Sequence, residues 1–142
     1  MKSLQIKITL ILILSLGFLS CAQKSNNKND VETIELKESV VSYISPKELN
    51  LRNENIQLID IRTPKEFSGG YLKNAKNINL YNPNFINEMN KLDKNKELYI
   101  YCRSGNRTGS ISKKLEDMGF KKIYDLKGGI LNWKRNNLEV EK

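Results

Sequence analysis

The residues best suited to chemistry lie in one loop near the middle of the chain. The loop reads Cys102-Arg103-Ser104-Gly105-Asn106-Arg107-Thr108-Gly109 and connects an apolar stretch typical of a strand to an amphipathic stretch typical of a helix. A helix N-terminus presents unpaired backbone N–H groups and a partial positive charge, which bind anions and favour the thiolate form of a nearby cysteine. The two arginines add positive charge, and Gly105 lets successive N–H groups point inward. We therefore predict an open loop that is both a nucleophile and an anion cradle.

The absence of histidine narrows the possible reactions. The 142 residues include 24 Lys and Arg, 16 Asp and Glu, two Cys and no His. This composition excludes Ser-His-Asp triads, Cys-His dyads, imidazole metal sites and a four-cysteine zinc site. No cofactor or metal is expected. The formal net charge of +8 comes from lysines scattered among asparagines, without a basic stripe that carries aromatic residues, so nucleic acid is not an expected partner.

The first 20 residues have the pattern of an export signal. Lys2 and Lys7 precede an apolar run that ends near Leu19 and is too short for a comfortable membrane span. The run closes in Leu19-Ser20-Cys21, which resembles a bacterial lipobox and implies a lipid anchor at Cys21. The expected location is then the bacterial cell envelope, on the inner or the outer membrane, and an ordinary cleaved signal is the alternative. Residues 21–39 are polar and are expected to form a flexible tether.

From residue 40 onward, predicted strands alternate with predicted helices. Strands are expected over residues 40–44, 56–62, 75–80, 97–101 and 122–126, and helices over residues 46–52, 63–67, 84–92, 107–118 and around Trp133. This alternation is typical of α/β proteins. We predict one domain over residues 40–138, with a central parallel five-stranded sheet and helices on both faces, followed by a C-terminal tail over residues 139–142. Ligand sites in such sheets lie at the carboxyl ends of strands, so Asp60 and Cys102 are expected at the same edge.

Three further motifs accompany the cysteine loop. They are Asp60-Ile61-Arg62 with Glu66-Phe67, the segment Gly70-Tyr71-Leu72-Lys73-Asn74-Ala75-Lys76-Asn77-Ile78, and Lys127-Gly128-Gly129 with Trp133. Together the four resemble the motifs of the rhodanese family in the same order. The sequence departs from the family pattern at Tyr71, where His is usual, and at Asn74, where Gly is usual. The resemblance covers about residues 41–138 and implies a single-domain rhodanese-like fold.

The resemblance also implies a thiosulfate sulfurtransferase. Cys102 would attack the outer sulfur of thiosulfate or a similar small anionic donor and become a persulfide, from which a thiol or cyanide removes the sulfur. Sulfite leaves without needing a proton, which suits a chain without histidine. The implied donor-binding residues are Arg103, Ser104, Gly105, Asn106, Arg107 and Thr108.

Other residues of these motifs are expected to support the loop. Asp60 is expected beneath it, hydrogen-bonded to the loop backbone, with a direct catalytic role as the alternative. Arg62 and Glu66 are expected to form a structural ion pair. The Gly128–Gly129 pair is expected to permit tight backbone passage, and a monomer is expected.

Two other functions compete with this interpretation. Cysteine phosphatases also use a Cys…Arg loop, but they place five residues between the two, whereas four separate Cys102 from Arg107. The shorter cradle suits a sulfur atom on the cysteine better than a phosphate. The second alternative is a persulfide carrier or binding module that serves a protein partner without turnover.

The position of Tyr71 is left open by the sequence. Its side chain is expected either on the surface or in the lining of the pocket.

Overall fold

The computed structural model describes residues 40–52 and 56–142 of the chain. The predicted signal over residues 1–20, the tether over residues 21–39 and Cys21 lie outside these described residues. Within the described ranges, no helix is both long enough and apolar enough to cross a membrane.

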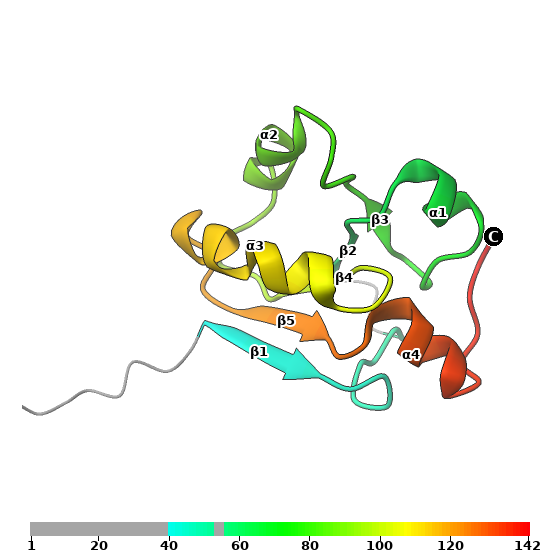
Figure 1. Ribbon diagram of the computed structural model, residues 1–142. Helices are drawn as coiled ribbons and strands as arrows, with labels where there is room; N and C mark the ends of the chain where they lie inside the picture. The colour runs from blue at the N-terminus through cyan, green and yellow to red at the C-terminus, as the bar shows by residue number, and fades with distance from the viewer. Residues whose placement is uncertain (1–39, 53–55) are drawn as a thin grey trace, which may run out of the picture. The chain divides into compact units, whose positions relative to one another are not determined.

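Five parallel strands form the sheet at the centre of the domain. They are β1 (Val41–Ile44), β2 (Gln57–Asp60), β3 (Lys76–Asn77), β4 (Leu98–Tyr101) and β5 (Ile123–Leu126). Their order is β1-β5-β4-β2-β3, and every neighbouring pair is parallel (Figure 1). The predicted parallel five-stranded sheet is therefore confirmed, with β4 as its middle strand.

Helices cover both faces of the sheet, as predicted. They are α1 (Pro64–Ser68), α2 (Phe85–Asn90), α3 (Asn106–Asp117) and α4 (Gly129–Arg135). Phe85 and Met89 of α2 pack in one hydrophobic cluster with Ile111 and Leu115 of α3, and Trp133 of α4 belongs to a second cluster. Each face of the sheet thus has its own core.

Alternation along β4 decides which core receives each side chain. Leu98 and Ile100 belong to the cluster of α2 and α3, whereas Tyr101 belongs to the cluster of α4. Successive side chains of a strand point to opposite faces, and Cys102 continues the pattern because it belongs to the α2–α3 cluster. The Cys102 side chain therefore lies between the sheet and α3.

Two predicted elements differ from those observed. Residues 46–52 form turns instead of a helix. The Ser45 N–H and hydroxyl both donate to Glu48 Oε2, at 2.8 and 2.6 Å. This contact is typical of a helix start, but Leu49 then packs in the second core and no helix follows. The strand expected over residues 75–80 shortens to β3, because the Asn77 amide donates to the carbonyls of Asp60 and Arg62 at 2.9 and 2.8 Å and takes the chain across the end of β2.

The last residues of the chain contact the domain. Tyr71 and Glu141 exchange both backbone hydrogen bonds, with N···O distances of 2.9 and 2.8 Å. The Trp133 indole N–H donates to the Glu139 carbonyl at 2.8 Å. The segment expected as a tail over residues 139–142 is thus joined to α4 and to the segment after α1.

Candidate active site

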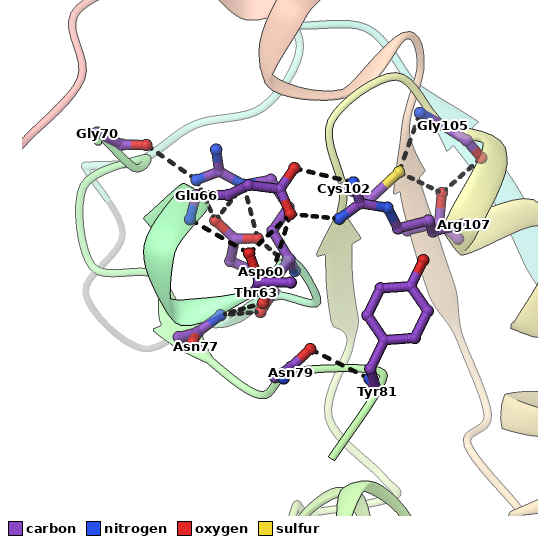
Figure 2. A network of polar contacts seen from close by, with 12 residues as sticks. Asp60, Thr63, Glu66, Gly70, Asn77, Asn79, Tyr81, Cys102, Gly105 and Arg107 are labelled. Atoms are coloured by element: carbon purple, nitrogen blue, oxygen red, sulfur yellow. Dashed lines mark hydrogen bonds and ion pairs between the residues drawn. The ribbon is translucent and has the colours of Figure 1, made fainter. Parts of the chain in front are cut away.

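The loop between β4 and α3 surrounds the Cys102 sulfur. Gly105 is the N-cap of α3 and has a φ of 96°, a left-handed conformation that favours glycine. This turn points the Gly105 N–H at Cys102 Sγ, 3.1 Å away, as Figure 2 shows. A backbone donor at the start of a helix stabilises negative charge on the sulfur. The predicted link between the thiol and the helix N-terminus is therefore present.

The thiol itself is buried, contrary to the expectation of an open site. Cys102 has no exposed surface, because it follows β4 in the alternation that points into the α2–α3 core. Arg103, Ser104 and Asn106 are exposed around it. These three side chains therefore form the exposed surface of the loop.

Thr108 also lies beneath the loop. It was expected among the donor-binding residues, yet its side chain has no exposed surface. Its hydroxyl donates to the Gly105 carbonyl at 2.9 Å and lies 3.9 Å from Cys102 Sγ. Thr108 therefore contacts the Cys102 sulfur from inside the core.

The expected ion pair between Arg62 and Glu66 is wrong. Arg62 instead pairs with Asp60, to which its Nε and Nη2 donate at 2.5–2.9 Å. Asp60 also accepts from the Arg62 backbone N–H at 2.9 Å, and Arg62 Nη2 reaches the Gly70 carbonyl at 2.8 Å. Because these contacts occupy the buried carboxylate, the expected hydrogen bond from the loop backbone to Asp60 is also wrong.

Glu66 pairs with Arg107 instead. Arg107 Nη1 and Nη2 donate to the two Glu66 carboxylate oxygens at 2.7 and 2.8 Å (Figure 2). The hydrogen bond from Arg107 lowers the pKa of Glu66 to about 2, and Glu66 in turn raises the pKa of Arg107. The pair is thus ionised at neutral pH and joins α1 to α3. Arg103 forms no ion pair among the described residues, which leaves it as the uncompensated cation of the loop.

The start of α4 holds the loop from its other side. The N–H groups of Ile130 and Leu131 donate to the carbonyls of Cys102 and Arg103 at 3.0 and 3.1 Å. Gly129 has a φ of 57°, and a Cβ placed on it would lie 2.4 Å from the Cys102 carbonyl oxygen. The expected tight passage at the glycine pair is confirmed, although the sequence did not show that the passage is against the cysteine loop.

Three aromatic residues near the site have distinct surroundings. Tyr71 stacks on Phe67 with ring centroids 4.1 Å apart, so it packs on α1. The Tyr101 hydroxyl accepts from the Leu72 N–H at 3.1 Å, and burial together with the Asp60 charge raises the pKa of Tyr101. Tyr81 is 65% exposed, and its ring lies 5.8 Å from the Arg107 guanidinium. The sequence analysis missed Tyr81, since an isolated tyrosine after a strand carries no specific signal.

The described residues contain no group of three or more His, Cys, Asp or Glu side chains placed to hold a metal ion. The described part of the chain includes cavities of about 520 and 320 Å³. The larger is lined by residues around Leu49 and Trp133, and the smaller by residues around Asn79 and Phe85. Neither borders Cys102.

Comparisons with known proteins agree with this geometry. The chain is 31% identical over 104 residues to a sulfurtransferase of Allochromatium vinosum, covering 71% of this chain and 95% of the relative. It is 37% identical over 98 residues to a tRNA uridine(34) hydroxylase of Pelagibacter ubique, covering 67% of this chain but only 33% of that longer protein. The crystal structure of a rhodanese-like domain protein from Staphylococcus aureus superposes with a TM-score of 0.58 at 29% identity, covering 71% of this chain and 99% of that structure. Since the family profile of the rhodanese-like domain matches residues 45–136, the chain belongs to the rhodanese-like domain family.

Proposed function

We propose that this protein is a sulfurtransferase in which Cys102 carries the transferred sulfur as a persulfide. The observation that carries the proposal is the 3.1 Å contact between the Gly105 N–H and Cys102 Sγ at the N-terminus of α3. It supplies the stabilised sulfur anion that covalent sulfur transfer needs. Membership of the family and the sulfurtransferase among its relatives support the same reaction class.

The donor that fits the loop best is a small anion such as thiosulfate. Arg103 is exposed and has no ion-pair partner among the described side chains, so it is available to a donor sulfonate. The Cys102 thiolate attacks the outer sulfur and a new S–S bond forms. The bond inside the donor breaks, and sulfite leaves with the electron pair. A thiol or cyanide then takes the outer sulfur and returns Cys102 to the thiolate.

A persulfide carrier for a protein partner is the second candidate. The burial of Cys102 favours it, because a partner could open the loop where a free small molecule does not. In that case the protein would accept one sulfur and release it only to the partner.

Thiocyanate production from thiosulfate and cyanide tests the proposal in the full-length chain. Wild type is expected to turn over many times, and Cys102→Ser is expected to lose all activity. Cys21→Ser is the matched control, because it removes the other cysteine of the chain and should retain activity. A folded Cys102→Ser variant that still produced thiocyanate would exclude the mechanism. A single loading of sulfur on Cys102 without turnover, seen by mass spectrometry, would favour the carrier.

We further propose that the protein is anchored to the cell envelope by lipid on Cys21. The sequence Leu19-Ser20-Cys21 after an apolar run supports this proposal. Wild type is expected to partition with membranes, and Cys21→Ser to appear in the soluble fraction or unprocessed. Membrane partition of Cys21→Ser equal to that of wild type would contradict the anchor.

A further inference from the structure

The cavity of about 520 Å³, which we call the Trp133 cavity, lies where three separate segments of the chain meet. They are the turns over residues 46–52, the segment between α1 and β3 at Lys73, and α4 with the last residues of the chain. Figure 1 shows the turns after β1 beside α4. The volume is within the range of about 300–1,000 Å³ that is typical of sites for small molecules.

The Trp133 cavity is distinct from the cysteine loop. Helix α4 holds that loop through the N–H groups of Ile130 and Leu131, and neither of these two residues lines the cavity. The cavity is bordered instead by Trp133 and by Leu138, beyond the end of α4. A ligand of this cavity would therefore occupy a site apart from the proposed nucleophile.

Apolar side chains form the inner wall of the Trp133 cavity. Trp133 and Leu49 are only 5% and 6% exposed, so the second core provides this part of the lining. The partly buried side chains of Leu51, Leu138 and Val140 pack against the same core and extend the wall. The Trp133 indole N–H donates to the Glu139 carbonyl at 2.8 Å, which fixes the ring and satisfies its polar atom. A ligand that fits this wall has an apolar body.

Charged side chains border the same cavity. Lys47, Arg52 and Lys73 are exposed cations, and none of them forms an ion pair among the described residues. Glu139 and Glu141 add two exposed carboxylates, so that three cations and two anions leave the lining with a formal charge of +1. The excess of positive charge favours an anionic ligand over a cationic one, and the cations are available to it.

We propose that the Trp133 cavity binds a small amphipathic anion, of which a medium-chain carboxylate is the simplest example. The acidic group pairs with the three cations, and the apolar chain packs on the wall at Trp133. Burial of the chain supplies most of the affinity, with a gain of about fourfold for each CH₂ group. The cations are exposed, so they contribute less and decide the sign of the charge that is accepted. The site does not depend on the proposed sulfur transfer.

Trp133 itself reports ligand binding in the full-length chain. It is the single tryptophan of the chain, so its fluorescence reports on this wall and not on the N-terminal residues. Hexanoate, heptanoate and octanoate are titrated at pH 7, below the concentration at which they form micelles. A saturable change is expected, with an affinity that rises about fourfold for each added CH₂. Octylammonium has a similar chain but the opposite charge, and it is expected to bind several-fold more weakly than octanoate.

Substitutions of exposed charges test the role of the cations. Lys73→Gln is expected to weaken octanoate binding about threefold. Lys113→Gln is the matched control, because Lys113 is an exposed lysine of α3 that does not border the cavity, and it should leave the affinity unchanged. Glu141→Gln should act in the opposite direction and strengthen octanoate binding about twofold. Opposite signs for two neutralising substitutions would not arise from a general loss of structure.

Four results would overturn the inference. They are an affinity that does not depend on chain length, octylammonium binding as tight as octanoate binding, equal effects of Lys73→Gln and Lys113→Gln, and no saturable response of Trp133. The last result is checked on the indole N–H resonance of Trp133 in NMR spectra, which reports on the same side chain if the fluorescence does not change. No sulfur donor is present in these titrations, so they are independent of the outcome for Cys102.

Discussion

The ion pair between Glu66 and Arg107 is expected to contribute measurably to the stability of the domain. We consider Glu66→Gln, because glutamine still fits the capping box in which Glu66 and Thr63 exchange hydrogen bonds at the start of α1. The substitution therefore removes the charge of the pair and leaves the local helix cap. Its effect reports the long-range contact between α1 and α3.

The size of the effect follows from the pKa of Glu66. Arg107, the largest cause, together with hydrogen bonds from Thr63 lowers that pKa from 4.5 to about 2. The full shift would correspond to about 3 kcal/mol if the groups were shielded from solvent, and the share of Arg107 is smaller. The side chains of Arg107 and Glu66 are 24% and 27% exposed, so solvent screening reduces the figure. A loss of about 1.5 kcal/mol in the free energy of unfolding at pH 7 is expected.

The pH dependence gives the sign of the effect. A carboxyl whose folded pKa is depressed stabilises the fold above its unfolded pKa and loses that contribution as pH falls through the folded value. The difference between wild type and Glu66→Gln should therefore be complete at pH 7 and narrow as pH falls from about 4.5 toward 2.

Urea denaturation followed by tryptophan fluorescence measures this difference, since Trp133 is the single tryptophan of the chain and is buried. Glu88→Gln is the matched control, because Glu88 forms an exposed pair with Lys91 and its loss should have a much smaller effect. Equal stability of wild type and Glu66→Gln at pH 7, or a difference that does not change with pH, would refute the reasoning.

Three further outcomes are expected. Gly129→Ala should destabilise the domain by roughly 2–4 kcal/mol and reduce sulfur transfer, because the new Cβ would clash with the Cys102 carbonyl. Gly109→Ala is the control: its Cβ would lie in open space, so the same denaturation assay should show unchanged or higher stability. Arg103→Ala should lower kcat/KM for thiosulfate by about tenfold, and the difference from wild type should shrink at high salt; an unchanged value at low salt would remove Arg103 from the donor site. Asp125→Asn should raise the free energy of unfolding at pH 7 by about 1–3 kcal/mol, because burial raises the pKa of Asp125 to about 6. An acid with a raised folded pKa costs stability as pH rises from about 4 to 6. At pH 3.5 the free energies of unfolding of wild type and Asp125→Asn should therefore be equal.

Local patterns in the sequence were sufficient to predict the elements that build the site. The apolar stretch around Ile100 predicted β4, and the loop residues with the amphipathic stretch after them predicted α3 with Cys102 at its start. The helix expected over residues 63–67 was also predicted correctly, since the partners of its capping box, Thr63 and Glu66, lie within one turn. These signals depend on neighbours in the chain, so the printed order of residues contains them. The turn at Pro46 shows the limit of such local signals. The contact between Ser45 and Glu48 forms, but Leu49 packs in the second core and the expected helix does not form.

The pairing of charges was decided only by the tertiary structure. Glu66 and Arg107 are 41 residues apart, and they meet because β2 and β4 are neighbours whose following segments leave the same edge of the sheet. The resemblance of this motif to the rhodanese family suggested Arg62 as the partner of Glu66, but the guanidinium of Arg62 pairs with the buried Asp60. The burial of Cys102 and its proximity to Thr108 likewise depend on which face of the sheet α3 covers. Such contacts depend on which separate elements pack together, and the local spacing of residues in the sequence does not show this.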